Sequence, residues 1–175
     1  TSSGSSGSIT LATGSATGGK GGDIRLSVGI GDSDSLRGGD IVLSGGVSTS
    51  STTGTGGYIS LSGGYGSSSS SGSIHIRSSN AGSFGVSGSL TFSSGTSSSG
   101  TSGYVMIATG NAVGGKGGDI YVSVGPGTNG DGGAVKILAG ETTDQNSNGG
   151  SLTMNGGYGS NIIGGAGGHA YVRGG

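Results

Sequence analysis

The sequence has no cysteine, no tryptophan and only one proline among its 175 residues. The lack of cysteine excludes a disulfide framework. Hydrophobic residues make up only 28% of the chain, which excludes an ordinary globular core. No apolar run exceeds a few positions, so neither a membrane-spanning helix nor a signal peptide is expected within the given sequence.

Charge is equally scarce. Charged residues account for 9% of the chain, and the formal net charge is −1. The seven lysines and arginines are scattered singly and form no basic patch, so no nucleic-acid partner is expected. A nearly neutral chain also has little self-repulsion to keep copies apart.

Glycine is what the chain has in abundance, with 48 residues. This composition alone is typical of low-complexity or disordered chains. However, one motif, G-x-Φ-x-Φ with Φ apolar, recurs along almost the whole chain at steps of 15–18 residues. Its apolar pairs are Ile9/Leu11, Ile24/Leu26, Ile41/Leu43, Ile59/Leu61, Ile74/Ile76, Leu90/Phe92, Val105/Ile107, Ile120/Val122, Val135/Ile137, Leu152/Met154 and Ala170/Val172.

The alternation of apolar residues has the period of a β-strand, and frequent glycine disfavours a helix. The repeat therefore predicts an all-β fold: a single-chain parallel β-solenoid of about eleven short coils, thin and flattened in cross-section, with its handedness undetermined. The apolar pairs are expected to form two continuous buried columns. The predicted coils cover residues 7–14, 22–29, 39–46, 57–64, 72–79, 88–95, 103–110, 118–125, 133–140, 150–157 and 168–175.

A second, longer period accompanies the first. Ala12–Gly29 and Ala108–Gly125 lie 96 positions apart and match at 14 of 18 positions. The segment GGYGS also recurs, at Gly63–Ser67 and Gly156–Ser160. This pattern indicates duplication of blocks of coils, and it favours one repeat domain over residues 1–175, cut from a longer repetitive protein.

The sequence basic-Gly-Gly-Asp occurs three times, as Lys20–Asp23, Arg37–Asp40 and Lys116–Asp119. We interpret each as a turn with a local ion pair, an interaction worth little at an exposed site. The alternative is calcium, because GGxGxD resembles the start of the calcium-binding nonapeptide repeat. The period of 15–18 residues and the absence of aspartate from other coils disfavour this alternative, so no metal is expected to be needed for folding.

Candidates for catalysis are weak. His75 and His169 are predicted to point outward, with no cysteine nearby. Asp23 and Asp40 occupy the same position in consecutive coils, but each follows a cation that favours charge neutralisation over acid–base chemistry. The other acids considered, which are expected on loops that do not align, are Asp32, Asp34, Asp131, Glu141 and Asp144. We therefore predict no enzyme, no catalytic, cofactor-binding or metal residues, and no cofactor.

Outward-facing aromatic and hydroxyl residues suggest binding as an alternative. Tyr58, Tyr104, Tyr121 and Tyr171 could stack on sugars, although they form no single column. The outward column has no ladder of threonines of the kind that ice-binding rods present. The alternative function is therefore a surface adhesin or a carbohydrate- or ice-binding solenoid module.

The recurrent segments GGDI-x-LS-G and SGSIT-x-ATG resemble the Gly/Ser-rich β-solenoid repeats of extracellular fibre and cell-surface proteins of algae and related protists, such as flagellar-hair and wall components. The resemblance covers all eleven coils. It implies a secreted structural protein, located outside the cell or on its surface, that associates with itself into filaments. It carries no functional residues over, because such proteins have no catalytic motif to match.

Two further expectations concern partners. Crowded serine and threonine at Ser48–Thr53, Ser67–Ser71 and Ser97–Ser99, together with the lack of any Asn-x-Ser/Thr acceptor, predict O-linked glycans. Extracellular polysaccharide is a second expected partner, whereas nucleic acid and membrane insertion are not expected. The shared motif of the first and last coils predicts head-to-tail assembly of chains.

Overall fold

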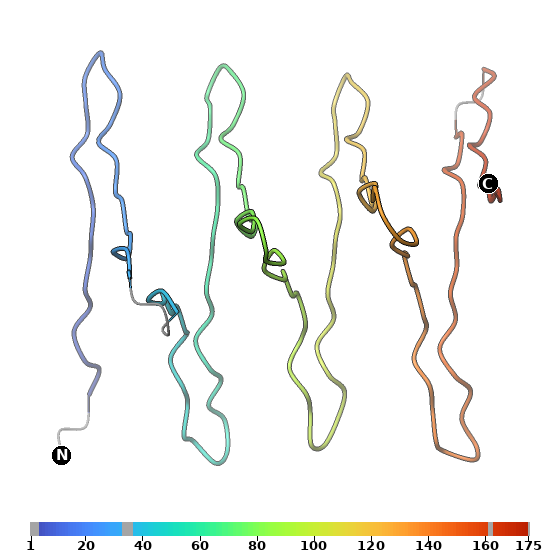
Figure 1. The fold of residues 1–175 in the computed structure, drawn as a ribbon, viewed down its shortest axis with the longest axis horizontal. Helices are drawn as coiled ribbons and strands as arrows, with labels where there is room; N and C mark the ends of the chain where they lie inside the picture. Colours follow the sequence, from blue (N-terminus) through green and yellow to red (C-terminus); the bar gives the residue numbers. More distant parts are fainter. Residues whose placement is uncertain (1–3, 33–36, 161–162, 175) are drawn as a thin grey trace. The chain divides into compact units, whose positions relative to one another are not determined.

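The computed structural model describes residues 4–32, 37–160 and 163–174. Within these ranges there is no α-helix and no β-strand, and the backbone consists of extended stretches and turns. The chain divides into two units, Thr1–Thr91 and Phe92–Gly175. Each unit is a succession of narrow loops whose two limbs run side by side (Figure 1).

Each narrow loop is closed at its base by a close contact, which we call the neck. One side of the neck is the glycine two residues before an apolar pair, and the other is the residue two positions after the preceding pair. In all ten intervals between the eleven apolar pairs, a Cβ atom added to a neck glycine would lie within 4 Å of the other neck residue. The ten necks are Thr13/Gly22, Val28/Gly39, Gly45/Gly57, Gly63/Gly72, Ser78/Gly88, Ser94/Gly103, Thr109/Gly118, Val124/Gly133, Ala139/Gly150 and Gly156/Gly168.

The necks explain why the repeat varies in length. The stretch from a neck glycine through the apolar pair to the next neck residue has a constant length, as in Gly22–Val28 and Gly118–Val124. The loops between neck residues vary, with sequence separations from 9 for Thr13/Gly22 to 12 for Gly45/Gly57. All of the variation in the 15–18-residue step therefore lies in the loops, where insertions are tolerated best.

At four of the necks, glycine lets the two limbs approach within backbone contact. Gly57 N–H donates to Gly46 O at 2.8 Å, and Gly168 N–H donates to Gly157 O at 2.8 Å. A side chain on Gly45 would overlap the carbonyl group of Gly57. Equivalent backbone bonds join Gly72 to Gly64 and Gly150 to Gly140, at 2.8 and 2.9 Å. Glycine at these four necks thus permits limb contact.

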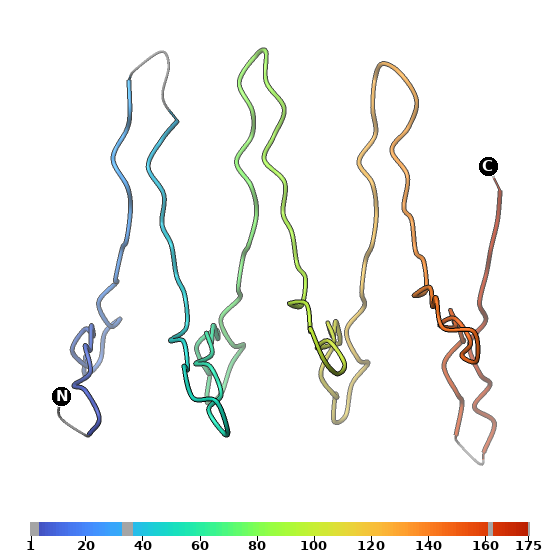
Figure 2. The same ribbon diagram turned by 90° about the horizontal axis from the view of Figure 1, so that it is seen from below.

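Several loops turn at a glycine in the left-handed region. Gly18 has a φ of 74° and Gly114 a φ of 78°, and the two lie at equivalent places in the loops closed by Thr13/Gly22 and Thr109/Gly118. Figure 2 shows the loops of residues 78–88 and 124–133 side on, and the second contains Gly130 with a φ of 79°. L-residues with a side chain avoid this conformation, so the sequence fixes where these loops turn.

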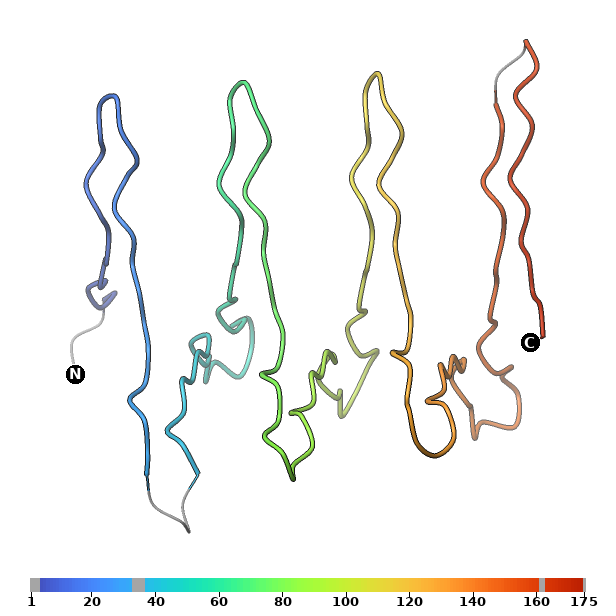
Figure 3. The ribbon, with the colours of Figure 1, turned by 45° about the horizontal axis from the view of Figure 1, so that its top comes forward.

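The predicted all-β fold and β-solenoid are wrong. A solenoid needs successive coils about 4.8 Å apart, joined by ladders of backbone hydrogen bonds. The described residues instead make single backbone bonds at or near loop bases and turns, six between described residues in all. The segments between apolar pairs close back on themselves at the necks instead of carrying the next pair alongside the previous one. The loops in Figure 3 show this return of the chain within each hairpin.

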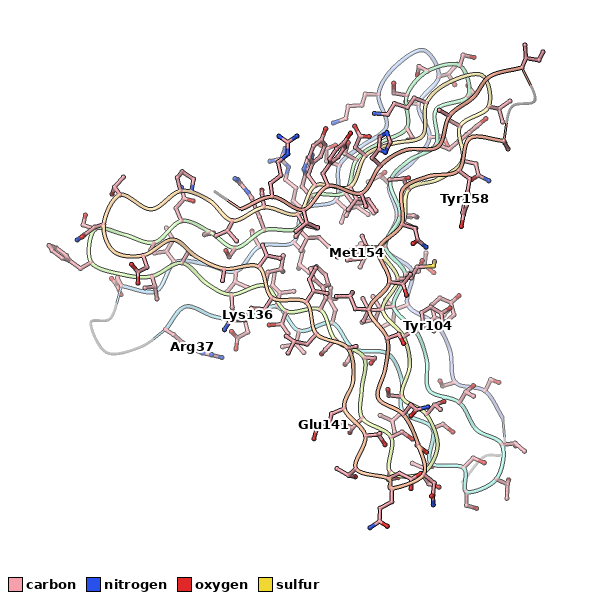
Figure 4. All side chains as sticks on the ribbon, turned by 90° about the vertical axis from the view of Figure 1, so that its right-hand side faces the viewer. Arg37, Tyr104, Lys136, Glu141, Met154 and Tyr158 are labelled. Carbon is pink, nitrogen blue, oxygen red and sulfur yellow. The ribbon has the colours of Figure 1, made fainter. Side chains whose placement is uncertain are left out.

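The predicted buried columns are wrong for the same reason. No described side chain is buried, and Ile24, Ile41, Ile59, Ile120 and Val135 are all half exposed, at 50–53%. Their partners in the expected second column are more exposed still, at 63–74%, and comprise Leu26, Leu43, Leu61, Val122 and Ile137. Side chains such as Tyr158 and Tyr104 extend away from the ribbon (Figure 4).

Candidate functional site

The ion pair predicted for each basic-Gly-Gly-Asp sequence is present, whereas the predicted turn is not, because the backbone of residues 20–23, 37–40 and 116–119 has neither a turn nor a bend. Lys20 Nζ lies 2.5 Å from Asp23 Oδ1, and Arg37 Nη2 lies 2.5 Å from Asp40 Oδ2. Lys116 Nζ lies 2.7 Å from the nearer carboxylate oxygen of Asp119. All these side chains are substantially exposed, so each pair contributes at most about 1 kcal/mol.

The calcium alternative requires free carboxylates gathered together. Each motif aspartate instead binds its own neighbouring cation, and Asp23 has a second one, Arg25, at 3.6 Å. Among the residues that the structure describes, no three His, Asp or Glu side chains are grouped as a metal site. Asp34, one of the candidate acids, lies outside the described residues, as does Gly175 at the end of the last predicted coil.

Asp144 organises the loop closed by Ala139/Gly150. Ser147 Oγ donates to its Oδ2 at 2.5 Å, and Asn146 N–H donates to its Oδ1 at 3.3 Å. Both bonds favour the ionised carboxylate, so the Ser147 hydroxyl first and the Asn146 backbone second lower the pKa of Asp144 below its ordinary value of 3.8. This is an Asx-type turn that shapes a loop, and it supplies no acid–base pair.

An open hollow in the second unit brings together stretches that are distant in sequence. Residues of 109–121 line one part and residues of 155–169 line the other. Its side chains with polar or aromatic chemistry are Thr109, Lys116, Asp119, Tyr121, Asn155 and His169. Tyr121 OH donates to Asp119 Oδ2 at 3.2 Å, and Lys116 Nζ lies 3.0 Å from the same oxygen. The hollow therefore has a fixed polar edge beside an aromatic ring.

A short row of side chains continues from the hollow. The His169 and Tyr171 rings lie 5.7 Å apart at an interplanar angle of 56°. The Arg173 guanidinium carbon lies 5.7 Å from the Tyr171 ring centroid, within reach of a cation–π contact. His169 was predicted only as an outward surface residue, and its alternation with Tyr171 and Arg173 is the signal that could have indicated the row.

The apolar pairs form a third candidate surface. From Ile24 to Leu152 the first member of every pair is 50–58% exposed, although its neighbours in sequence vary widely. Ile9, in the first pair, is fully exposed. The first members of the inner pairs are therefore shielded to a similar degree by the repeated limb geometry.

A scan against protein-family models finds no matching family, and searches of curated proteins and of solved structures find no similar chain. In the part of the chain that the structure describes, no helix is long and apolar enough to cross a bilayer.

Proposed function

We propose that this protein is a structural, self-assembling component of an extracellular fibre. The observation that carries the proposal is a regular series of apolar pairs in a chain that buries no described side chain. Removing apolar area from water stabilises by about 25 cal/mol per Å², and folding within one chain leaves this gain unused. Covering the pairs with further protein would recover it.

Further copies of the same chain suit these pairs best. A repetitive chain presents the same apolar pair every 15–18 residues, so a contact made by one pair can be made again by the next. The backbone can also form hydrogen bonds with further chains. Folded proteins make about one internal hydrogen bond per residue, whereas the backbone–backbone bonds between described residues number only six. A low net charge of −1 opposes association only weakly.

The extracellular location rests on the resemblance to fibre and cell-surface repeats of algae and related protists. Exposed hydroxyl-rich loops such as Ser67–Ser71 are suited to O-linked glycans, which would limit sideways aggregation of fibres. Mass spectrometry of proteolytic peptides from native material tests this point: we expect the peptide that contains Ser67–Ser71 to be heavier than its sequence mass by whole sugar residues. A peptide at the bare sequence mass would contradict glycosylation and leave assembly to be tested separately.

Sedimentation velocity over a concentration series, followed by electron microscopy, tests self-assembly. We expect large, elongated species that grow with concentration. A variant that makes the apolar pairs polar, Ile59→Ser, Leu61→Ser, Ile120→Ser and Val122→Ser together, should remain small.

The matched control also changes four exposed apolar residues, but outside the pairs: Ile30→Ser, Val47→Ser, Val86→Ser and Val113→Ser, at residues that are 90–103% exposed. This control should assemble normally. A wild-type chain that stays monomeric at every concentration, or a control that is as defective as the pair variant, would overturn the proposal.

A further inference from the structure

We propose that the hollow of the second unit binds a neutral polysaccharide, with Tyr121, His169 and Tyr171 as its aromatic contacts. The inference goes beyond fibre assembly, because it assigns a ligand-binding role to one place in the repeat. It starts from the juxtaposition of residues 109–121 with residues 155–169 around a common hollow.

The aromatic groups are accessible to a ligand. Tyr121 is 86% exposed and Tyr171 is 74% exposed. His169 lines the same hollow as Tyr121, and its ring lies 5.7 Å from that of Tyr171. Tyrosine offers an apolar ring face and a polar hydroxyl at low entropic cost, which suits a ligand with alternating C–H faces and hydroxyl groups.

Polar groups that can exchange hydrogen bonds with sugar hydroxyls flank these rings. Asp119 accepts from Tyr121 OH and is paired with Lys116, so the carboxylate and the tyrosine hydroxyl lie together at one edge of the hollow. Asn155 adds an amide with both donors and acceptors. Three glycines, Gly156, Gly157 and Gly168, also line the hollow, and no side chain projects from these positions. A few fixed polar groups beside an apolar surface are typical of a small-molecule site.

The chemistry of the hollow disfavours other ligands. A nucleic acid would need unneutralised cations along its phosphates, but Lys116 is paired with Asp119 and the chain carries a net charge of −1. A purely apolar ligand would have to remove the Asp119 carboxylate and the Asn155 amide from water without compensation. An uncharged chain of pyranose rings satisfies both the rings and the polar groups.

The first unit contains a natural control at the equivalent positions, 96 residues earlier. Arg25 stands where the second unit has Tyr121, Ser73 where it has His169, and His75 where it has Tyr171. Lys20 and Asp23 preserve the ion pair there. The duplicated blocks therefore share the ion pair but differ in the aromatic residues, and binding should be specific to the second unit.

The test uses the full chain and cellohexaose, whose equatorial linkages expose flat C–H faces, in saturation-transfer difference NMR, a method that also works on large assemblies. We expect transfer from protein aromatic protons to the ring C–H protons of the sugar. The double variant Tyr121→Arg, Tyr171→His carries the residues that this chain already has at the equivalent positions of the first unit. This variant should bind cellohexaose about tenfold more weakly than the wild type. Tyr58→Arg, at a tyrosine outside the hollow, should leave binding unchanged.

Two results would overturn the inference. One is an absence of transfer at millimolar cellohexaose, or equal transfer in the wild type and the double variant. The other is stronger binding of polygalacturonate than of cellohexaose, increased further by Tyr121→Arg, which would show a site for acidic polymers. Sedimentation of the same variants keeps the two proposals separate, because loss of sugar binding with normal assembly affects this inference alone.

Discussion

The two duplicated segments, Ala12–Gly29 and Ala108–Gly125, form almost the same local structure from sequences that differ at four positions. Thr13 Oγ1 donates to Gly22 O at 3.2 Å, and Thr109 Oγ1 donates to Gly118 O at 3.3 Å. The loops turn at glycines with φ angles of 74° and 78°. Identical residues at the neck and at the turn are therefore sufficient to reproduce the loop.

The segments differ in the partners of their aspartates because of one exposed position. Arg25 lies 3.6 Å from Asp23 and adds a second cation to the first segment. Tyr121 occupies the equivalent position in the second segment and donates a neutral hydroxyl to Asp119. Because this position lies outside the neck and the turn, it can change without altering the loop. The repeat thus separates residues that fix shape from residues that set surface chemistry.

The largest effect is expected at the necks. Gly63→Ala and Gly156→Ala place a methyl group against the backbone of Gly72 and Gly168, where no side-chain rotation can relieve the overlap. The necks should open, and the Gly72 and Gly168 amides should exchange with solvent at the rate of a free peptide. Hydrogen-exchange NMR measures this rate.

The adjacent glycines provide the matched control for the neck variants. An added Cβ at Gly64 or Gly157 has no atom within 4 Å. Gly64→Ala and Gly157→Ala should therefore keep the slow exchange of the wild type. Equal exchange in the two sets of variants would show that the necks are not steric contacts.

A smaller effect is expected at the loop turns. Gly18→Ala and Gly114→Ala force a side chain into the left-handed region, at a cost of about 1–2 kcal/mol. The nuclear Overhauser contact between the Thr13 methyl group and Gly22, and its equivalent in the second segment, should weaken to the same extent. Gly19→Ala and Gly115→Ala are the controls, since open space surrounds both positions. Unequal losses in the two segments would contradict the shared geometry.

The comparison also shows how far the sequence predicts this fold. The ion pairs of the Lys-Gly-Gly-Asp sequences follow from spacing alone, because they depend on residues near each other in sequence. The arrangement of the repeats does not. Glycine two residues before each apolar pair is compatible with a solenoid corner and with a neck, and only contacts such as that of Gly57 with Gly45 distinguish them.

The candidate binding hollow could be predicted only in part. Tyr121 and Tyr171 are recognisable as outward aromatics, but sequence separation hides the shared hollow of Tyr121 and His169. The buried columns could not be excluded from the sequence, because alternating Ile and Leu indicate an extended segment with an apolar face and do not indicate which molecule covers it. The half-exposed Ile24 and Ile120 show that the covering is absent within the described chain.

A third loop, closed by Ala139/Gly150, lacks the ion pair of the duplicated segments and relies on Asp144 instead. Ser147→Ala removes the main hydrogen bond to its carboxylate, so the pKa of Asp144 should rise toward its ordinary value. Because the folded pKa is lowered, the contribution of these bonds is present above the ordinary value of 3.8 and is lost as pH falls through the lowered pKa. NMR titration of the Asp144 carboxyl carbon measures the shift, and an unchanged pKa in the variant would contradict this role for Ser147.

The smallest effect, and the one that most sharpens the comparison, concerns salt. Lys20→Gln and Lys116→Gln should each destabilise their turns by less than about 1 kcal/mol, because the ion pairs are exposed. Asp23 retains the Arg25 cation after the change, whereas Asp119 retains the Tyr121 hydroxyl. Salt screens a contact between charges, while a neutral hydroxyl donor is much less sensitive to it. In these variants the Asp23 carboxyl chemical shift should therefore respond to salt between about 0.01 and 1 M, and that of Asp119 should respond less.

Adding Arg25→Tyr to the first variant and Tyr121→Arg to the second should exchange the two responses. If they remain as they were, the outward position does not control the electrostatics of the turn, and the difference between the segments must come from Ser15/Asn111, Thr17/Val113 or Leu26/Val122.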